Sequence, residues 1–332
     1  MDDPGGDIAA GREGALGRRG DGARSRSSPP GPRSGTGAGR VCTSSWNKAL
    51  GYLPRRGRGV TDIAACVVLA DPIAAAMDRV RADVLPGLVG QGEVNLPWRR
   101  GQTPRGHRVG EPQPPGVYST LEAMVKSGVC VGATLRAGGA SEPARWGDTD
   151  EVAPDDQLAI RGPFPGFSQA NDAVNARLRE VVAEWAAAEG AHVLELYAGH
   201  GNLTLALAPG AASVRAVEMS EEAARFGTAN ARAAGFDHVT FIPGDVAKHI
   251  KGPADIVVLD PPRTGAKDVM AAILALRPRR IVYVSCDVAT LGRDLATLRE
   301  GGYAPTRARA FDMFPQTAHV ESVVLAEPVG GG

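Results

Sequence analysis

The sequence predicts an α/β protein whose C-terminal half is a doubly wound, mostly parallel β-sheet that ends in an antiparallel strand. From about residue 167, short apolar runs alternate with amphipathic stretches of helical periodicity, and this alternation indicates a parallel sheet covered on both faces. The last two apolar runs, 305–310 and 320–326, have no helix between them. An antiparallel final strand explains that break in the pattern.

The individual elements of this sheet follow from the apolar runs and their flanking residues. A helix over 171–188 leads into the first buried strand, and each later strand is followed by a turn and a helix until the end of the chain. The strands are expected at 192–196, 214–218, 239–242, 256–259, 281–285, 305–310 and 320–326, and the later helices at 221–234, 266–276 and 289–300.

Composition divides the chain into three parts. Residues 1–40 are rich in Gly, Arg, Ser and Pro and have almost nothing to bury, so they are expected to form a disordered tail. Residues 41–165 are expected to form a small α+β domain, and residues 166–328 the doubly wound domain. Within the small domain we expect a helix over 72–85, strands at 117–121 and 129–135, and a loop over 96–115.

Overall composition excludes several classes of protein. No run of about 18 apolar residues offers a membrane span, and the N-terminus lacks the apolar region of a secretory signal. The 37 basic and 37 acidic residues balance, so charge alone does not indicate nucleic acid. The four cysteines are too far apart for a disulfide scaffold or a zinc ribbon. We therefore expect a cytoplasmic protein that has no metal site and does not bind a membrane.

The turn after the first strand predicts an adenosine cofactor. Gly199 and Gly201 allow the backbone to approach a ligand closely, and Glu218, at the end of the second strand, can accept both ribose hydroxyls. The third glycine of a dinucleotide-binding turn is replaced here by Thr204, which favours S-adenosylmethionine over NAD. Two interpretations of Asp245, after the third strand, stay open: a contact to the adenine amino group, or a helix N-cap.

Three polar residues are expected at the carboxyl edge of the sheet, where such folds bind ligands. Asp260 ends the fourth strand, and Cys286 leaves the fifth just before a helix, whose N-terminus favours the thiolate. A buried, inert thiol is the alternative for Cys286. Glu321 begins the antiparallel strand and therefore shares this edge. His319 either orients the substrate or caps the loop.

A thiolate, a carboxylate and a methyl donor together suit the methylation of uracil at carbon 5. Thiolate addition to carbon 6 makes carbon 5 nucleophilic, and a base must later remove the carbon 5 proton so that the thiol can leave. Cys286 and Glu321 can fill these two roles.

Six segments of the chain resemble the RNA 5-methyluridine methyltransferases, which act on transfer and ribosomal RNA. The resemblance extends over roughly 50–327. Its segments are FSQAN (167–171), LYAGHGNLTL (196–205), AVEMS (216–220), LDPPRTG (259–265), IVYVSCDVATLGRDL (281–295) and DMFPQTAHVESVVL (312–325). The resemblance implies a seven-stranded methyltransferase sheet, Cys286 as nucleophile and Glu321 as base. The residues that it implies for S-adenosylmethionine contact are Gln169, Tyr197, Asn202, Glu218, Asp245 and Asp260.

The chain departs from this family in three places. Val288 stands where the family usually has proline, and the disordered tail takes the place of a small RNA-binding β-barrel. Some members bind an iron–sulfur cluster through three clustered cysteines and a later one. Cys66 matches the later position, but only Cys42 precedes it, so we expect no cluster.

The expected partner is an RNA, and the protein is expected to be a monomer. The target uridine must leave its stack, so a single-stranded loop or bulge of rRNA or tRNA is the expected substrate. The side chains that can meet phosphates or stack a base are Arg55, Arg56, Arg58, Trp98, Arg99, Arg100, Arg105 and Arg108. Solvated loop arginines are the alternative. A related methyltransferase acting on cytosine or on a non-RNA acceptor, and a non-catalytic RNA-binding protein, remain as other functions.

Overall fold

The computed structural model describes residues 38–44, 49–52, 60–66, 71–97, 105–130, 132–137, 142–149, 151–153, 160–163, 169, 171–315 and 317–330. The predicted tail lies outside these residues except for its last three. Of the predicted RNA-contacting side chains, Arg55, Arg56, Arg58, Trp98, Arg99 and Arg100 also lie outside them. The division of the chain into three parts therefore stays a prediction.

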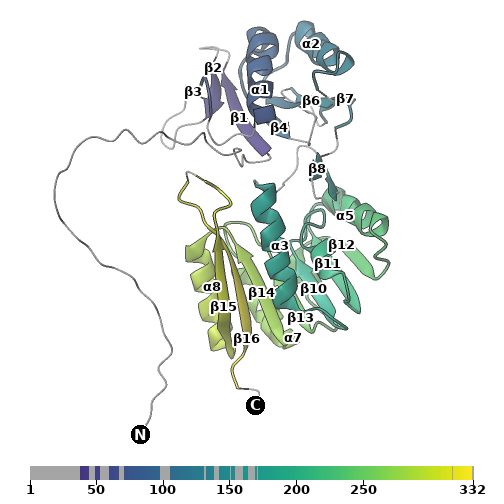
Figure 1. Ribbon diagram of the computed structural model, residues 1–332, viewed down its shortest axis with the longest axis vertical. Coiled ribbons are helices and arrows are strands. Elements are labelled where there is room, and N and C mark those ends of the chain that lie inside the picture. Colours follow the sequence, from purple (N-terminus) through teal and green to yellow (C-terminus); the bar gives the residue numbers. More distant parts are fainter. Residues whose placement is uncertain are drawn as a thin grey trace, which may run out of the picture. The chain divides into compact units, whose positions relative to one another are not determined.

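A seven-stranded sheet forms the C-terminal half of the protein and confirms the predicted fold (Figure 1). The strand order is β12 (Val239–Pro243), β11 (Ser213–Glu218), β10 (His192–Leu196), β13 (Ile256–Leu259), β14 (Arg280–Ser285), β16 (Glu321–Pro328) and β15 (Tyr303–Phe311). The first five strands of this order pair in parallel, and β16 is antiparallel to both β14 and β15.

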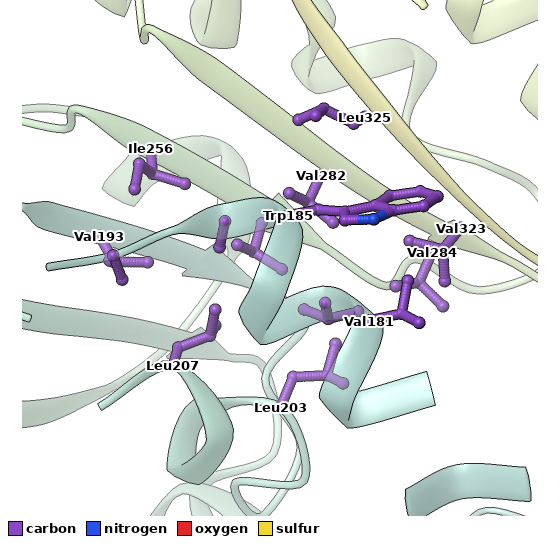
Figure 2. Close-up of a cluster of buried hydrophobic side chains, with 14 of the residues drawn as sticks. Val181, Trp185, Val193, Leu203, Leu207, Ile256, Val282, Val284, Val323 and Leu325 are labelled. Carbon is purple, nitrogen blue, oxygen red and sulfur yellow. The ribbon is translucent and has the colours of Figure 1, made fainter. Parts of the chain in front are cut away.

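The central strands are buried on both faces, which explains their nearly continuous apolar sequences. In β14, Val282 and Val284 enter a cluster with Trp185, whereas Ile281 and Tyr283 enter the cluster on the opposite face. Figure 2 shows the first cluster, in which the Trp185 ring lies beside Val282 and the valines of β14 and β16. Burying apolar surface on both faces stabilises the sheet by about 25 cal/mol per Å², so this core holds the strand ends in place.

Helices on the two faces begin at side-chain caps or at tight turns. Asn171, Ser220 and Asp287 each accept a hydrogen bond from a backbone N–H of the first turn of the helix that follows. The first cluster takes residues from α3 (Asp172–Ala186) and α4 (Thr204–Leu207), and the opposite cluster from α6 (Val246–His249), α7 (Met270–Leu276) and α8 (Val288–Glu300). Helix α5 (Glu221–Ala233) packs on β12, and the 3-10 turn η3 (Lys267–Val269) precedes α7.

A second seven-stranded sheet lies in the N-terminal half. Its order is β3 (Thr61–Asp62), β2 (Ala49–Tyr52), β1 (Ala38–Ser44), β4 (Gln91–Pro97), β5 (Arg105–Val109), β6 (Gly132–Arg136) and β7 (Ala144–Gly147). Strands β5 and β6 pair in parallel, and the other neighbours are antiparallel. The helix predicted over 72–85 is present as α1 (Asp71–Arg79), continued by the π-turn η1 (Val80–Val84) and the 3-10 turn η2 (Leu85–Gly87). A separate pair, β8 (Glu151–Ala153) and β9 (Ile160–Gly162), follows in the chain.

Two predictions for this half were wrong. The run 117–121 lies in helix α2 (Pro115–Lys126), where Val117, Leu121 and Met124 are buried on one face at helical spacing. Pro115 occupies the first helical position, which suits its fixed φ. The stretch 96–115, predicted as a loop, contains β5. Within the part of the chain that the structure describes, every helix is too short or too polar to cross a membrane.

Candidate active site

Three adjacent strands bring Asp260, Cys286 and Glu321 to one edge of the C-terminal sheet. Asp260 follows β13 and Cys286 follows β14, while Glu321 begins β16, and these strands are neighbours in the order β13-β14-β16. The β14–β16 ladder ends with Ser285 opposite Ser322, so one further step of the same register sets Cys286 opposite Glu321. The charge of Glu321 acts on the Cys286 thiol. The two side chains are therefore close enough to act on one substrate.

Burial changes the proton affinity of both carboxyl groups at this edge. Glu321 is 3% exposed, and burial raises its pKa to about 7. Burial also raises the pKa of Asp260 to about 8, and the nearby charge of Glu321 adds to that rise. Near neutral pH, each group exists in both protonation states, so this pair can accept or supply a proton during a reaction.

The pKa of the Cys286 thiol differs from what the sequence led us to expect. Burial raises its pKa above the ordinary value, and the charges of Glu321 and Asp260 act in the same direction. The helix N-terminus does not offset this, because Asp287 already occupies it: its Oδ1 accepts hydrogen bonds from the backbone N–H groups of Ala289 and Thr290 at 3.1 and 2.9 Å. The pKa of the thiol is therefore raised overall, whereas the sequence had led us to expect a helix end that favours the thiolate.

Arg263 supplies the positive charge that the helix end does not. Its guanidinium donates a hydrogen bond to the Cys286 thiol, and its charge lowers the pKa of that thiol against the effect of burial. Sequence analysis placed Arg263 within the segment LDPPRTG but gave it no role. Its position directly after Pro261 and Pro262, on the turn that follows β13, was the signal that could have placed it at this edge.

The glycine turn after β10 lies beside the carboxylate of Glu218. Gly199 and Gly201 have φ values of 57° and 105°, and the Tyr197 backbone is also left-handed at 63°. A Cβ at Gly199 would meet no atom within 4 Å, so the turn faces open space there. Glu218 accepts hydrogen bonds from the backbone N–H groups of Gly199 and Ser220, one on each oxygen, both at 2.8 Å. Each oxygen retains a further lone pair for a ligand.

A second carboxyl group lies beneath this turn, on β10. Glu195 is 1% exposed, and burial raises its pKa to about 8, with smaller contributions from the charges of Asp260 and Glu218. Hydrogen bonds from the side chain and the backbone of Thr204 lower this pKa against the effect of burial. A buried carboxyl group therefore lies close to the charges of Asp260 and Glu218, with Thr204 as its hydrogen-bond donor.

The remaining predicted site residues occupy different surroundings. Gln169 is 8% exposed, and its Nε2 donates to Oδ2 of Asp260 at 3.5 Å. Asn202 instead exchanges two hydrogen bonds with Asn175 of α3, at 2.8 and 3.0 Å, so its side-chain amide is engaged within the protein. Asp245 is the N-cap of α6 and accepts from the backbone N–H of Ala247 at 3.1 Å. The ring of His319 packs edge-on against Phe314.

Comparison with known proteins identifies the family. A family model described as tRNA (Uracil-5-)-methyltransferase matches residues 152–245 and 252–329. The chain belongs to this family. The matched residues include Cys286, Glu321, Arg263 and the glycine turn, so the geometry described above lies within the part that defines the family.

Three individual proteins show how far the similarity extends. The chain is 34% identical over 289 residues to the 23S rRNA (uracil(1939)-C(5))-methyltransferase RlmD of Klebsiella pneumoniae, covering 84% of this chain and 66% of that one. It is 44% identical over 167 residues to an uncharacterized RNA methyltransferase of Thermotoga maritima, covering 49% of this chain and 38% of that one. The crystal structure of Pyrococcus abyssi tRNA (uracil-54, C5)-methyltransferase with S-adenosyl-L-homocysteine has a TM-score of 0.71 and 20% identity, covering 90% of this chain and 77% of that one. This last likeness shows the shared fold.

Proposed function

We propose that this protein transfers a methyl group from S-adenosylmethionine to carbon 5 of a uridine in rRNA or tRNA. The observation that carries the proposal is the arrangement at the sheet edge: the Cys286 thiol hydrogen-bonded by Arg263, with Glu321 on the neighbouring strand. The family membership and the printed activities of the relatives support the same reaction. Because the chain covers only part of the lengths of those relatives, the substrate rests on this proposal.

The glycine turn and its surrounding acids fit S-adenosylmethionine. Glu218 keeps acceptor capacity beside a turn that faces open space, which suits the two ribose hydroxyls. The buried carboxyl group of Glu195, near the charges of Asp260 and Glu218, suits the cationic amino group of the methionine part. Gln169, Tyr197, Gly199, Gly201, Asp245 and Asp260 are the further residues that we propose around the cofactor. Asn202 acts through Asn175, since its amide holds the turn against α3.

Cys286 begins the reaction by adding to carbon 6 of the uracil ring. Its sulfur bonds to that carbon, and the ring electrons move onto the carbonyl oxygen to form an enolate. The guanidinium of Arg263 stabilises the thiolate that must form first, against the opposing effects of burial and of Glu321. The bound cofactor supplies an electrophilic methyl group, to which carbon 5 then becomes attached.

Glu321 completes the reaction by removing the proton from carbon 5. The electron pair of that C–H bond restores the ring double bond, and the Cys286 sulfur leaves carbon 6 as a thiolate. A carboxyl group whose pKa is about 7 is a stronger base than an ordinary glutamate. Glu321 therefore suits a proton transfer from carbon better than an exposed carboxylate does.

The substrate that this site requires is an unstacked uridine. The target base must leave its helix or loop to reach Cys286, so we propose a single-stranded loop or bulge as the recognised structure. Arg105 and Arg108 lie in β5 of the N-terminal sheet, and they belong to the predicted RNA-contacting set. The absence of an iron–sulfur cluster and the monomeric state stay predictions.

One experiment tests the proposed activity directly. The protein is incubated with total RNA that lacks 5-methyluridine and with cofactor carrying a labelled methyl group, and the RNA is digested to nucleosides. We expect the label in 5-methyluridine. Label in 5-methylcytidine would instead favour the related class that methylates cytosine. Cofactor binding with no labelled nucleoside would favour a non-catalytic RNA-binding protein.

A further inference from the structure

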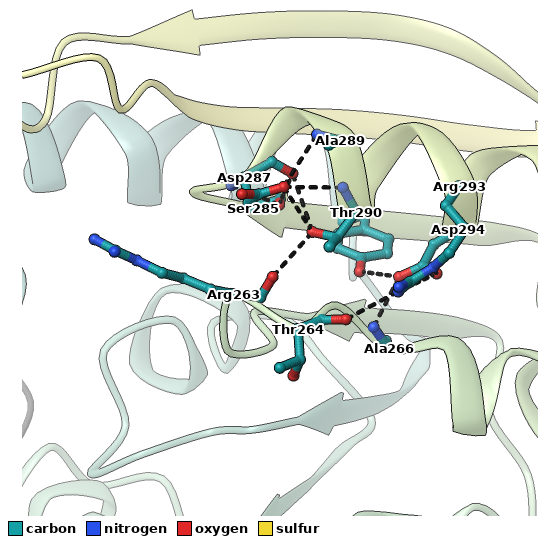
Figure 3. Close-up of polar contacts among 10 residues, drawn as sticks. Arg263, Thr264, Ala266, Ser285, Asp287, Ala289, Thr290, Arg293 and Asp294 are labelled. Carbon is teal, nitrogen blue, oxygen red and sulfur yellow. Dashed lines mark hydrogen bonds and ion pairs between the residues drawn. The ribbon is translucent and has the colours of Figure 1, made fainter.

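One face of α8 binds the turn that follows β13 through three consecutive attachments. Thr290 Oγ1 lies 3.2 Å from the backbone carbonyl of Arg263, and its one proton is shared among this oxygen and the carbonyl and Oδ1 of Asp287, both also at 3.2 Å. Arg293 Nη2 donates to the carbonyl of Thr264 at 2.9 Å. Asp294 Oδ2 accepts from the backbone N–H of Ala266 at 2.7 Å. The three helix residues, at i, i+3 and i+4, share one face, and Figure 3 shows them lined up against the turn.

We call these three contacts between α8 and the turn the α8 anchor, and Asp294 is its buried member. It is fully buried, and besides Ala266 it accepts a hydrogen bond from the Tyr283 hydroxyl at 2.7 Å and one from Arg293 Nε at 2.9 Å. A buried carboxylate is costly unless donors surround it. The hydrogen bond from Ala266 attaches this carboxylate to the turn, while those from Tyr283 and Arg293 hold the carboxylate itself in place.

Gly265 shows that the turn and the helix are fitted to each other. Its φ is 76°, and a Cβ at this position would lie 2.4 Å from Arg293 Nη2 and 2.6 Å from Asp294 Oδ2. Only glycine allows the backbone to approach these two side chains so closely. This close approach holds residues 263–266 in a single path.

The same helix follows Cys286 directly, so the anchor fixes the turn relative to the nucleophile. We propose that Thr290, Arg293 and Asp294 are positioning residues that hold the turn so that the guanidinium of Arg263 stays against the thiol of Cys286. The proposal rests on the proposed function for the role of Cys286, but its consequence concerns the thiol itself. Without the anchor, Arg263 leaves the sulfur, which then faces only the carboxyl groups of Glu321 and Asp260.

Thiol alkylation tests this proposal without RNA or cofactor. The full-length protein is treated with iodoacetamide over pH 6 to 10, and alkylation of the Cys286 peptide is followed by mass spectrometry, separately from the other cysteines. We expect Thr290→Val to slow alkylation of Cys286 at pH 7 by about 3- to 10-fold and to move its pH profile upward, because less of the thiol is ionised. Arg263→Gln should give the same or a larger change.

Two controls separate positioning from folding. Thr290→Ser keeps the hydroxyl and should restore the wild-type profile. Thr228→Val removes a comparable hydroxyl in α5, one bonded to the carbonyl of Ala224 at 3.0 Å, and should leave the profile unchanged. Asp294→Asn should shift the profile further where it folds, and circular dichroism reports whether it does.

The outcomes are distinguishable from those of the proposed function. An unchanged Cys286 profile in folded Thr290→Val, or in Arg263→Gln, overturns the proposed anchor even if the enzyme methylates uridine. A shifted profile that Thr290→Ser restores supports the anchor even if no methylated nucleoside is found, because the readout depends only on the thiol.

Discussion

The C-terminal sheet presents acidic residues at two places on one edge, and their surroundings differ. Glu218, beside the glycine turn after β10, accepts a hydrogen bond from a backbone N–H on each of its oxygens. Glu321, beside Cys286, is buried, and burial raises its pKa to about 7. Burial favours the neutral form of a carboxyl group, whereas the Glu218 oxygens are held in place by backbone donors beside the glycine turn. The same residue type therefore suits ligand binding at one place and proton transfer at the other.

The largest effect should come from removing the sulfur at the chemical site. Cys286→Ala is expected to reduce methylation by more than about a thousandfold, because no other described group can add to carbon 6. Cofactor affinity should stay unchanged, since the cofactor turn is a separate part of the edge. Turnover with labelled cofactor and calorimetric titration measure the two. Substantial remaining activity would show that the chemical site works without a covalent step.

Replacing the base should separate methyl transfer from release. Glu321→Gln keeps the shape of the side chain but cannot remove the carbon 5 proton, so turnover should fall by about 10²–10⁴-fold. The covalent protein–RNA adduct should accumulate as a slow band on denaturing gels. That band should disappear when Cys286 is also replaced by alanine. A 5-fluorouridine RNA should trap the same species on the wild type, and a trapped peptide containing Cys66 or Cys130 would contradict the assignment.

A change at the cofactor turn should weaken binding and leave the thiol chemistry alone. Glu218→Ala is expected to reduce cofactor affinity by about 1–3 kcal/mol, because charge-assisted hydrogen bonds to ribose are lost. Isothermal titration calorimetry measures this change. The alkylation profile of Cys286 serves as the matched control and should not move. Wild-type affinity in a folded variant would exclude Glu218 as a ribose ligand.

The smallest effect concerns stability and pH. The pKa of Glu321 is higher in the folded protein than in the unfolded chain, so the folded state binds more protons between pH 4.5 and about 7. Stability from this group is fully present below the unfolded pKa and is lost as pH rises through the folded pKa. Glu321→Gln should therefore be more stable than wild type by about 1–2 kcal/mol at pH 8. Urea unfolding at pH 5 and pH 8 tests this, and an equal difference at both pH values would contradict it.

The sequence predicted the doubly wound sheet well because its strands are buried on both faces. A run such as 256–259 is apolar throughout, and the structure has a strand at those residues. Residues 117–121 were misassigned because a short apolar run fits a strand or one buried helical turn equally well. Strand β5 (Arg105–Val109) was missed because its sequence, RGHRV, is mostly polar and lacks the alternating apolar pattern of a half-buried strand.

For the candidate site, sequence reasoning found the edge but not the charges around the sulfur. Strand order alone brings Cys286 and Glu321 to neighbouring positions. The contact of Arg263 with the thiol depends on the path of a turn held by α8, and residue spacing does not reveal such a path. The rise in the pKa of the thiol comes first from burial, which residue spacing does not reveal.

The antiparallel pairing of β14 with β16 makes the spacing of the chemical groups independent of the chain between them. Cys286 and Glu321 lie at the end of the ladder whose last pair is Ser285 and Ser322, whereas the turn between α8 and β15 lies outside that ladder. Extra residues at the exposed turn of Gly301 and Gly302 should therefore lengthen that turn and leave the separation of the two groups intact. We therefore expect that a peptide tag or a fluorescent reporter inserted at that turn leaves the distance between Cys286 and Glu321 unchanged.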